Sequence, residues 1–175
     1  MSEIIRIAGF DPGLRFTGYG VVNYDTEKNE IWVSNAGLAK KKSTVKGIDG
    51  LSYMKTLLRD VTNRECFADC DKIVVEVPAA VFFKNFSAGA LIPVAVVSGM
   101  ILQMFDNDRL IPVYPASWNG GRKKDNVKHR TYQIVGPHED WLFDDAPRVE
   151  SQFEHIIDAV SMALWCLETK YLDGQ

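Results

Sequence analysis

The stretch of sequence that decides the fold runs from residue 9 to residue 22 and reads GFDPGLRFTGYGVV. It begins at the end of an apolar segment, residues 3–10, and leads into a second one, residues 16–24. Between them lies Asp11-Pro12-Gly13, whose residue types are typical of a tight turn. A third segment of strand type, residues 30–38, follows a short polar turn. Three strands in a row with short links predict an antiparallel meander.

Downstream of the meander the hydrophobic pattern changes its period. Apolar residues recur at steps of three and four between Leu51 and Val61, which predicts a helix with Asp49 at its N-cap. We expect further strands at residues 72–78 and 110–114, helices at 86–105, 127–135 and 152–170, and irregular chain at 136–150. The expected fold is a single α/β domain over residues 1–175. Its five-stranded mixed sheet, an antiparallel meander followed by parallel strands, is flanked by helices.

Composition narrows the class of protein. The chain is 46% hydrophobic and 25% charged, which suits an ordinary globular core. No apolar run approaches the roughly 18 residues that span a bilayer, so we expect no membrane association and a cytoplasmic protein. Cys66, Cys70 and Cys166 form no Cys-x-x-Cys pair, and we interpret them as reduced thiols, with zinc binding as the less favoured alternative.

Basic residues are segregated along a chain of net charge −3. Two windows, residues 40–46 and 122–130, hold nine of the 20 basic residues and one of the 23 acidic ones. The remainder of the chain has a net charge of −11. This pattern suits a protein that meets phosphate on one side, although two solvated lysine-rich loops would produce the same pattern.

Three carboxylates stand in unusually apolar surroundings. Asp11 ends an apolar strand face, Glu76 lies within Ile-Val-Val-Glu-Val, and Asp158 opens a helical run with no other charge. Each alone is explained by a cap or an ion pair. Because a lone buried carboxylate costs several kcal/mol, the three together favour one shared cation site. Oxygen ligands suit Mg²⁺, and a pair of such ions supports phosphodiester hydrolysis.

A histidine belongs to the same candidate site. His155 lies three residues before Asp158, which places the two side chains on one helical face. We interpret it as a fourth ligand or a general base. Glu154, four residues before Asp158, competes for that role.

At this point the chain resembles the RuvC family of Holliday-junction resolvases. The resemblance rests on residues 9–22, on Val74-Val75-Glu76 with Lys84-Asn85 downstream, and on His155-Ile156-Ile157-Asp158-Ala159. It implies a ribonuclease H-like fold, a homodimer, and paired Mg²⁺-dependent nicks across a four-way junction in branched DNA. The family's four metal-binding catalytic positions map onto Asp11, Glu76, His155 and Asp158. Many members carry Asp where His155 stands, and imidazole favours Mn²⁺ as a substitute for Mg²⁺.

The resemblance also implies DNA contacts. Phe82 or Phe83 would wedge into the junction, although two adjacent Phe also suit a core, and Lys84 follows them. Lys128 is the better match to a basic residue that stabilises developing charge, and Lys124 is the alternative. The remaining basic residues of the second window are expected on phosphates: Arg122, Lys123 and Arg130. The helix at 88–105 is where the family dimerises, whereas the acidic stretch 138–150 matches nothing in it.

Other functions fit parts of the pattern. An actin-like or sugar-kinase ATPase also opens with an Asp-bearing strand turn, but it needs two such domains, for which 175 residues leave no room. A ribonuclease H-like nuclease acting on RNA or an RNA–DNA hybrid would share the fold. A non-catalytic junction-binding protein is disfavoured, because acids facing phosphate weaken binding.

Overall fold

A computed structural model describes residues 3–42, 44–78, 88–144, 147 and 149–172. Its sheet has five strands in the order β3-β2-β1-β4-β5. The first three strands form the predicted antiparallel meander, and the last two continue the sheet in parallel with β1. The predicted fold class is therefore confirmed. The strands are β1 (Ile4–Asp11), β2 (Phe16–Asp25), β3 (Glu30–Lys40), β4 (Lys72–Glu76) and β5 (Leu110–Val113).

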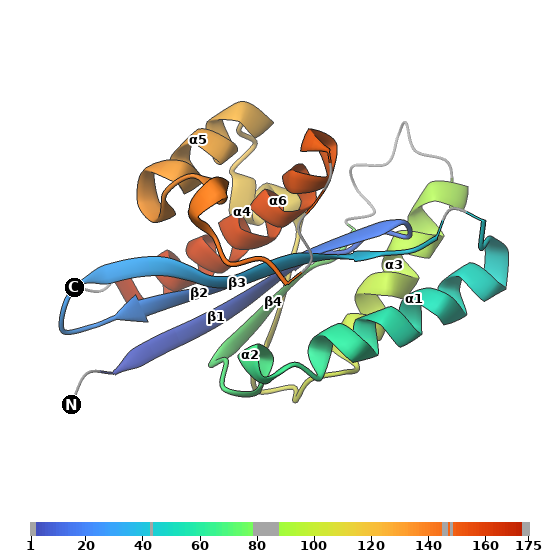
Figure 1. Ribbon diagram of the computed structural model, residues 1–175, viewed down its shortest axis with the longest axis horizontal. Coiled ribbons are helices and arrows are strands. Elements are labelled where there is room, and N and C mark those ends of the chain that lie inside the picture. Colours follow the sequence, from blue (N-terminus) through green and yellow to red (C-terminus); the bar gives the residue numbers. More distant parts are fainter. Residues whose placement is uncertain (1–2, 43, 79–87, 145–146, 148, 173–175) are drawn as a thin grey trace.

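Helices cover both faces of this sheet, and the described residues form three α-helices on each face (Figure 1). One layer contains α1 (Gly47–Thr62), α2 (Glu65–Ala68) and α3 (Ala88–Leu102). The other contains α4 (Pro115–Asn119), α5 (Lys124–Val135) and α6 (Glu150–Leu167). In the described part of the chain, no helix is long and apolar enough to cross a membrane.

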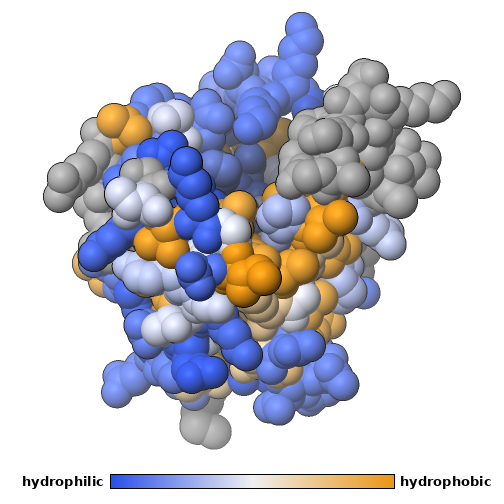
Figure 2. Space-filling view, turned by 90° about the vertical axis from the view of Figure 1, so that its right-hand side faces the viewer, coloured by the Kyte–Doolittle hydropathy of each residue, from blue (hydrophilic) through white to orange (hydrophobic). Residues whose placement is uncertain are grey.

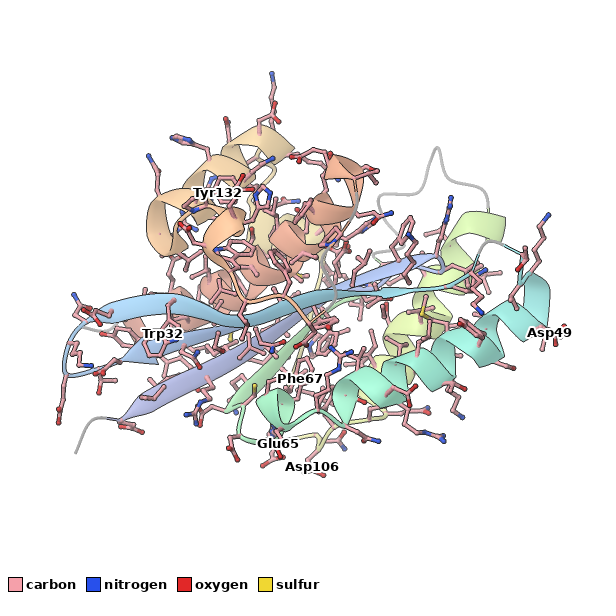
Figure 3. The ribbon with its side chains drawn as sticks, viewed as in Figure 1. Trp32, Asp49, Glu65, Phe67, Asp106 and Tyr132 are labelled. Carbon is pink, nitrogen blue, oxygen red and sulfur yellow. The ribbon has the colours of Figure 1, made fainter. Side chains whose placement is uncertain are left out.

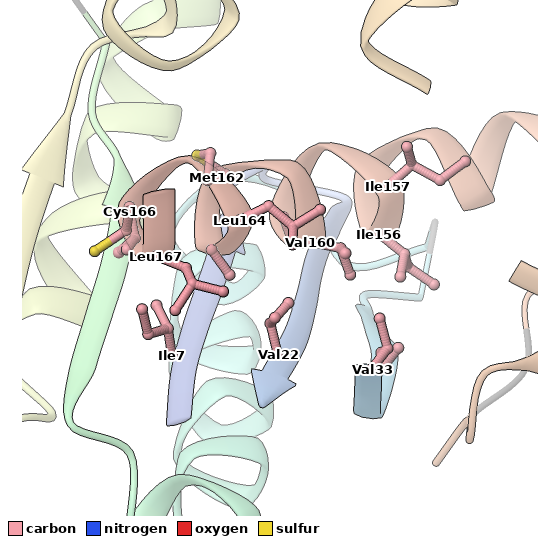
Figure 4. Close-up of a cluster of buried hydrophobic side chains, with 14 of the residues drawn as sticks. Ile7, Val22, Val33, Ile156, Ile157, Val160, Met162, Leu164, Cys166 and Leu167 are labelled. Carbon is pink, nitrogen blue, oxygen red and sulfur yellow. The ribbon is translucent and has the colours of Figure 1, made fainter. Parts of the chain in front are cut away.

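Alternation of side chains along the strands divides the apolar residues between two cores. Ile7 and Val22 pack beneath Val160 and Leu164 of α6 (Figure 4). Residues of opposite parity face the other helices, where Phe10 packs against Phe67 with ring centroids 5.2 Å apart. Figure 3 shows Phe67 on the side of the sheet away from α6. The odd-numbered face of β1, which ends at Asp11, is thus the face covered by α6.

The helical predictions need correction in several places. Helix α1 begins at Gly47 with Lys46 at its N-cap, so Asp49 lies in the first turn, where the helix dipole favours a carboxylate. Helix α5 begins at Lys124, three residues earlier than predicted. The short helices α2 and α4 were not predicted, because four or five residues are too few to show a helical period.

Part of the acidic stretch after α5 packs against the edge of the sheet. Ala36 N–H of β3 donates to the Leu142 carbonyl at 2.9 Å, and Asp144 N–H donates to the Ala36 carbonyl at 3.1 Å. Trp141 is buried there, and Asp144 forms a 2.5 Å ion pair with Arg64. The stretch predicted to be irregular, residues 136–150, thus contains a short 3₁₀ turn, His138–Asp140, and one isolated bridge between Phe143 and Ala36, and the rest of its described chain before α6 is irregular as predicted.

Candidate active site

Asp11 and Glu76 lie at the same end of two neighbouring parallel strands. Phe10 pairs with Val75, so the next residue of each strand is one of these acids. Both belong to the sheet face that α6 covers, and both are only partly exposed. Two strand ends thus supply two carboxylates to one edge of the sheet.

Helix α6 approaches these strands closely because two residues there are glycines. A Cβ atom at Gly9 would stand 1.9 Å from the Ala159 carbonyl oxygen, and one at Gly18 would stand 2.1 Å from that of His155. Neither contact is possible without moving the helix backbone. The glycines of the opening motif therefore set the distance between sheet and helix, and this distance brings the side chains of α6 to Asp11.

His155 makes the shortest contact in the site. Its Nδ1 lies 2.5 Å from Asp11 Oδ2, and its ring lies 5.9 Å from that of Phe16, centroid to centroid. The hydrogen bond to Asp11 raises the pKa of His155 above its ordinary value, against the opposing effect of burial. The competing candidate, Glu154, is 52% exposed and lies 3.4 Å from Lys124 Nζ, so it lies outside this contact.

Glu76 and Asp158 resist ionisation in this environment. Burial, followed by the charge of Asp11, raises the pKa of Glu76 to about 7. Trp118 of α4 opposes this shift, because its Nε1–H donates to Glu76 Oε2 at 2.8 Å. Burial and Asp11 likewise raise the pKa of Asp158 to about 6, with Lys124 opposing. In the absence of a cation, burial and the neighbouring charge of Asp11 therefore both favour the protonated forms of Glu76 and Asp158.

These groups line a single pocket of about 260 Å³. Lys124 reaches it from the first turn of α5, with Nζ 3.8 Å from Asp158 Oδ2. Burial lowers the pKa of Lys124, but Asp158 and Glu154 outweigh that effect and leave it raised. The lining residues are Asp11, Glu76, Pro115, Trp118, Asn119, Arg122, Lys124, Val127, His155 and Asp158.

The donor set of this pocket fits a divalent cation. Carboxylate oxygens are the preferred ligands of Mg²⁺, and the raised pKa values of Glu76 and Asp158 mark charge that a cation would relieve. Among the described residues, however, no three acidic, histidine or cysteine side chains already stand as a coordination shell. The hydrogen bond between His155 and Asp11 occupies atoms that ligation by both residues would use.

The predicted DNA-binding residues divide into two groups. Arg122 and Lys124 line the pocket, and Lys123 is exposed beside them at the N-cap of α5. Lys128 lies one turn further along α5 and contacts Glu150 at 2.5 Å, while Arg130 binds both Glu168 oxygens at 2.5 and 2.6 Å. Lys124, and not Lys128, is thus the cation placed against the carboxylates. Phe82, Phe83 and Lys84 lie outside the described residues.

The sequence did not predict the roles that Trp118 and Gly18 have in the site. Trp118 is buried and holds Glu76, but α4 is too short to show a helical pattern around it. Gly18 was predicted only as part of a motif, whereas its role is the close approach of α6. The only signal for either was local: Pro115, which starts α4, and the alternation of Gly with bulky residues in β2.

Comparisons with known proteins place this geometry in context. No protein-family model and no curated protein matches the sequence. Solved structures do match. Thermus thermophilus RuvC in complex with a Holliday junction has a TM-score of 0.68 at 17% identity, with 97% of each chain covered.

Two further structures agree with this likeness. The yeast mitochondrial Holliday junction resolvase has a TM-score of 0.61 at 15% identity, with 97% of this chain and 82% of that one covered. The fowlpox virus resolvase in complex with Holliday junction DNA has a TM-score of 0.57 at 17% identity, covering 95% and 99%. The chain therefore has the fold of RuvC-type resolvases, as the sequence motifs predicted.

Proposed function

We propose that this chain, which has the fold of RuvC-type resolvases, is a metal-dependent endonuclease that cuts four-way DNA junctions. One observation carries the proposal. Asp11, Glu76 and Asp158 come from two strands and a helix, and they converge with His155 in one pocket. A binding module gains nothing from acids that face phosphate, whereas a nuclease needs them to hold cations.

The pocket residues define what the protein would do in the reaction. Asp11, Glu76, Asp158 and His155 would hold two Mg²⁺ ions, with Mn²⁺ as a substitute that imidazole favours. Bound there, a pair of divalent ions activates water and stabilises the leaving oxygen of a phosphodiester. Trp118 would keep Glu76 oriented.

Cations and aromatic residues would position the DNA around this pocket. Lys124 would balance the negative charge that develops on the phosphate, a role for which it lies closer to the carboxylates than Lys128 does. Arg122 would contact the scissile strand from the same side. The junction-wedge roles of Phe82 and Phe83, with Lys84, remain proposals from the family resemblance.

A homodimer is the expected assembly, because a four-way junction needs two symmetric cuts. The apolar helix α3 would form the interface. Its Ile92 is 62% exposed. Ile48, at the start of α1, is 82% exposed. Figure 2 shows apolar residues gathered on the end of the molecule where α1 and α3 begin. Burying such surface against a second copy would stabilise a dimer.

The decisive test is a cleavage panel of four-way junction, three-way junction, flap and RNA–DNA hybrid, run with Mg²⁺ and with Mn²⁺. We expect preferential cutting of the four-way junction. Asp11→Asn should abolish cutting while junction binding persists. The matched control is Asp106→Asn, at an exposed carboxylate on the side of the sheet away from α6 (Figure 3). Undiminished cleavage by Asp11→Asn would rule out this site, and a preference for the hybrid would favour the RNA-directed alternative.

A further inference from the structure

A second basic surface lies beside the catalytic pocket, at the other end of β3 from its turn with β2. Arg15 follows the β1–β2 turn, and Lys40 ends β3; both are exposed. Phe16 lies between them, with the Arg15 guanidinium 5.0 Å and Lys40 Nζ 5.9 Å from its ring centroid. The Phe16 ring in turn lies against His155. This basic surface is therefore continuous with the pocket through one aromatic residue.

The chain at the end of β3 has one buried lysine between two exposed ones. Lys41 is buried, and its ammonium group donates to the Val45 and Lys42 carbonyls, which closes the turn back on itself. Its backbone N–H donates to the Arg15 carbonyl at 2.9 Å. With Lys41 directed inward, its neighbours Lys40 and Lys42 are exposed. A buried lysine thus fixes two exposed ones beside Arg15.

These residues line a groove that has space for a ligand. One hollow of about 520 Å³ is lined by Arg15, Lys40, Lys41, Lys42 and Thr44, and none of these described residues is an acid. Lys40 and Lys42 also line an adjoining hollow of about 670 Å³, where Asp60 is the acid. Within the described residues, Arg15, Lys40 and Lys42 make no ion pair. In a chain whose sequence outside its two basic windows is strongly acidic, cations that gather in one groove without an ion pair among the described residues indicate an anionic partner.

We infer that this groove binds the phosphate backbone of a DNA duplex arm as the arm leaves the catalytic pocket. The inference rests on the proposed function for the identity of the ligand. The described lining of the first hollow includes no aromatic ring, and the Phe16 ring beside it is approached by both Arg15 and Lys40, so unpaired bases find no open stacking surface there, which favours a duplex over a single strand. The cations near the pocket thus come from two separate parts of the chain. One part contributes the groove residues Arg15, Lys40 and Lys42, and the other contributes Arg122 and Lys124.

The test measures binding of a linear duplex in EDTA as a function of salt. Lys40→Gln/Lys42→Gln should reduce the slope of log affinity against log salt by about 2, roughly one for each lost phosphate contact. The control, Lys28→Gln/Lys170→Gln, removes the same charge from exposed positions at the opposite end of the sheet and should leave the slope unchanged. Thermal melting of both variants would verify the fold.

Binding and cleavage separate the two proposals. If the salt dependence of Lys40→Gln/Lys42→Gln equals that of the control variant, the groove does not bind the duplex, whatever the cleavage panel shows. A slope reduced by about 2 supports the groove, even if wild-type protein fails to cut four-way junctions and the proposed function falls.

Discussion

Replacing Glu76 by Gln should make the metal-free protein more stable while destroying its proposed activity. The pKa of Glu76 rises from 4.5 to about 7 in the folded protein. Because a change of one in pKa corresponds to about 1.4 kcal/mol, the ionised carboxylate costs the folded state about 3 kcal/mol. The substituted side chain would carry no charge, and its amide oxygen could still accept the Trp118 hydrogen bond.

The sign of this effect fixes its pH range. A carboxyl with a raised pKa binds its proton more tightly in the folded state, so stability falls as pH rises. For Glu76 the loss begins near pH 4.5 and is complete above about pH 7. At pH 4 both proteins carry a neutral side chain and should unfold alike. At pH 8 Glu76→Gln should be more stable by up to about 3 kcal/mol, which corresponds to a melting temperature about 6–12 °C higher.

Urea unfolding and thermal melting in EDTA at pH 4 and pH 8 measure this difference. Glu30→Gln, at an exposed position that begins β3, is the matched control and should change little. Adding Mg²⁺ at pH 8 should stabilise wild type and have little effect on Glu76→Gln, since a ligand stabilises only the state that binds it. Equal stabilities at pH 8, or a difference that is the same at pH 4, would refute the electrostatic account of the site.

The remaining predictions concern the geometry around this carboxylate. Gly18→Ala should destabilise the fold and abolish cleavage, because the added Cβ would clash with the His155 carbonyl. The control, Gly99→Ala in α3, adds a Cβ with nothing within 4 Å and should change neither property. Melting and cleavage assays compare the two variants. Trp118→Phe removes a hydrogen bond that stabilises the charged form of Glu76, so the pH at which Mn²⁺ binding is half-maximal should rise by about 1. An unchanged half-maximal pH would exclude this role for Trp118. At limiting Mg²⁺, wild-type cleavage should rise as pH increases up to about 7, and a flat profile would contradict the raised pKa of Glu76.

Much of the fold was predictable from the sequence, because burying one side of an element places apolar residues at regular intervals along the chain. The spacing of three and four in α1 is a repeated signal that matches one buried face, and the apolar run of β1 matches a strand buried on both faces. Boundaries had weaker signals. Helix α5 begins at Lys124 behind Lys123, whose side chain makes no capping hydrogen bond, so residue types could not mark its start. Lys128 was preferred to Lys124 on the family resemblance alone, and its catalytic role stays a prediction.

The site was partly predictable for a different reason. A carboxylate in an apolar segment is a costly exception, so Asp11, Glu76 and Asp158 could be singled out individually. Their partners had no such mark. Trp118 looks like an ordinary core residue, and its hydrogen bond to Glu76 depends on the placement of α4 after β5. Contacts between elements distant in the chain have no local signature.

The charge distribution has a consequence for how metal and DNA would act together. In the metal-free protein a phosphate that enters the pocket would be repelled by Asp11, Glu76 and Asp158, and Arg122 and Lys124 beside them would offset that repulsion only in part. The cations of Arg15, Lys40 and Lys42 flank the pocket and attract the duplex without relieving that repulsion. A divalent cation would relieve it from within, and a bound phosphate would add an oxygen ligand to the cation. Metal and DNA should therefore each bind more tightly in the presence of the other, and by linkage the two enhancements must be equal.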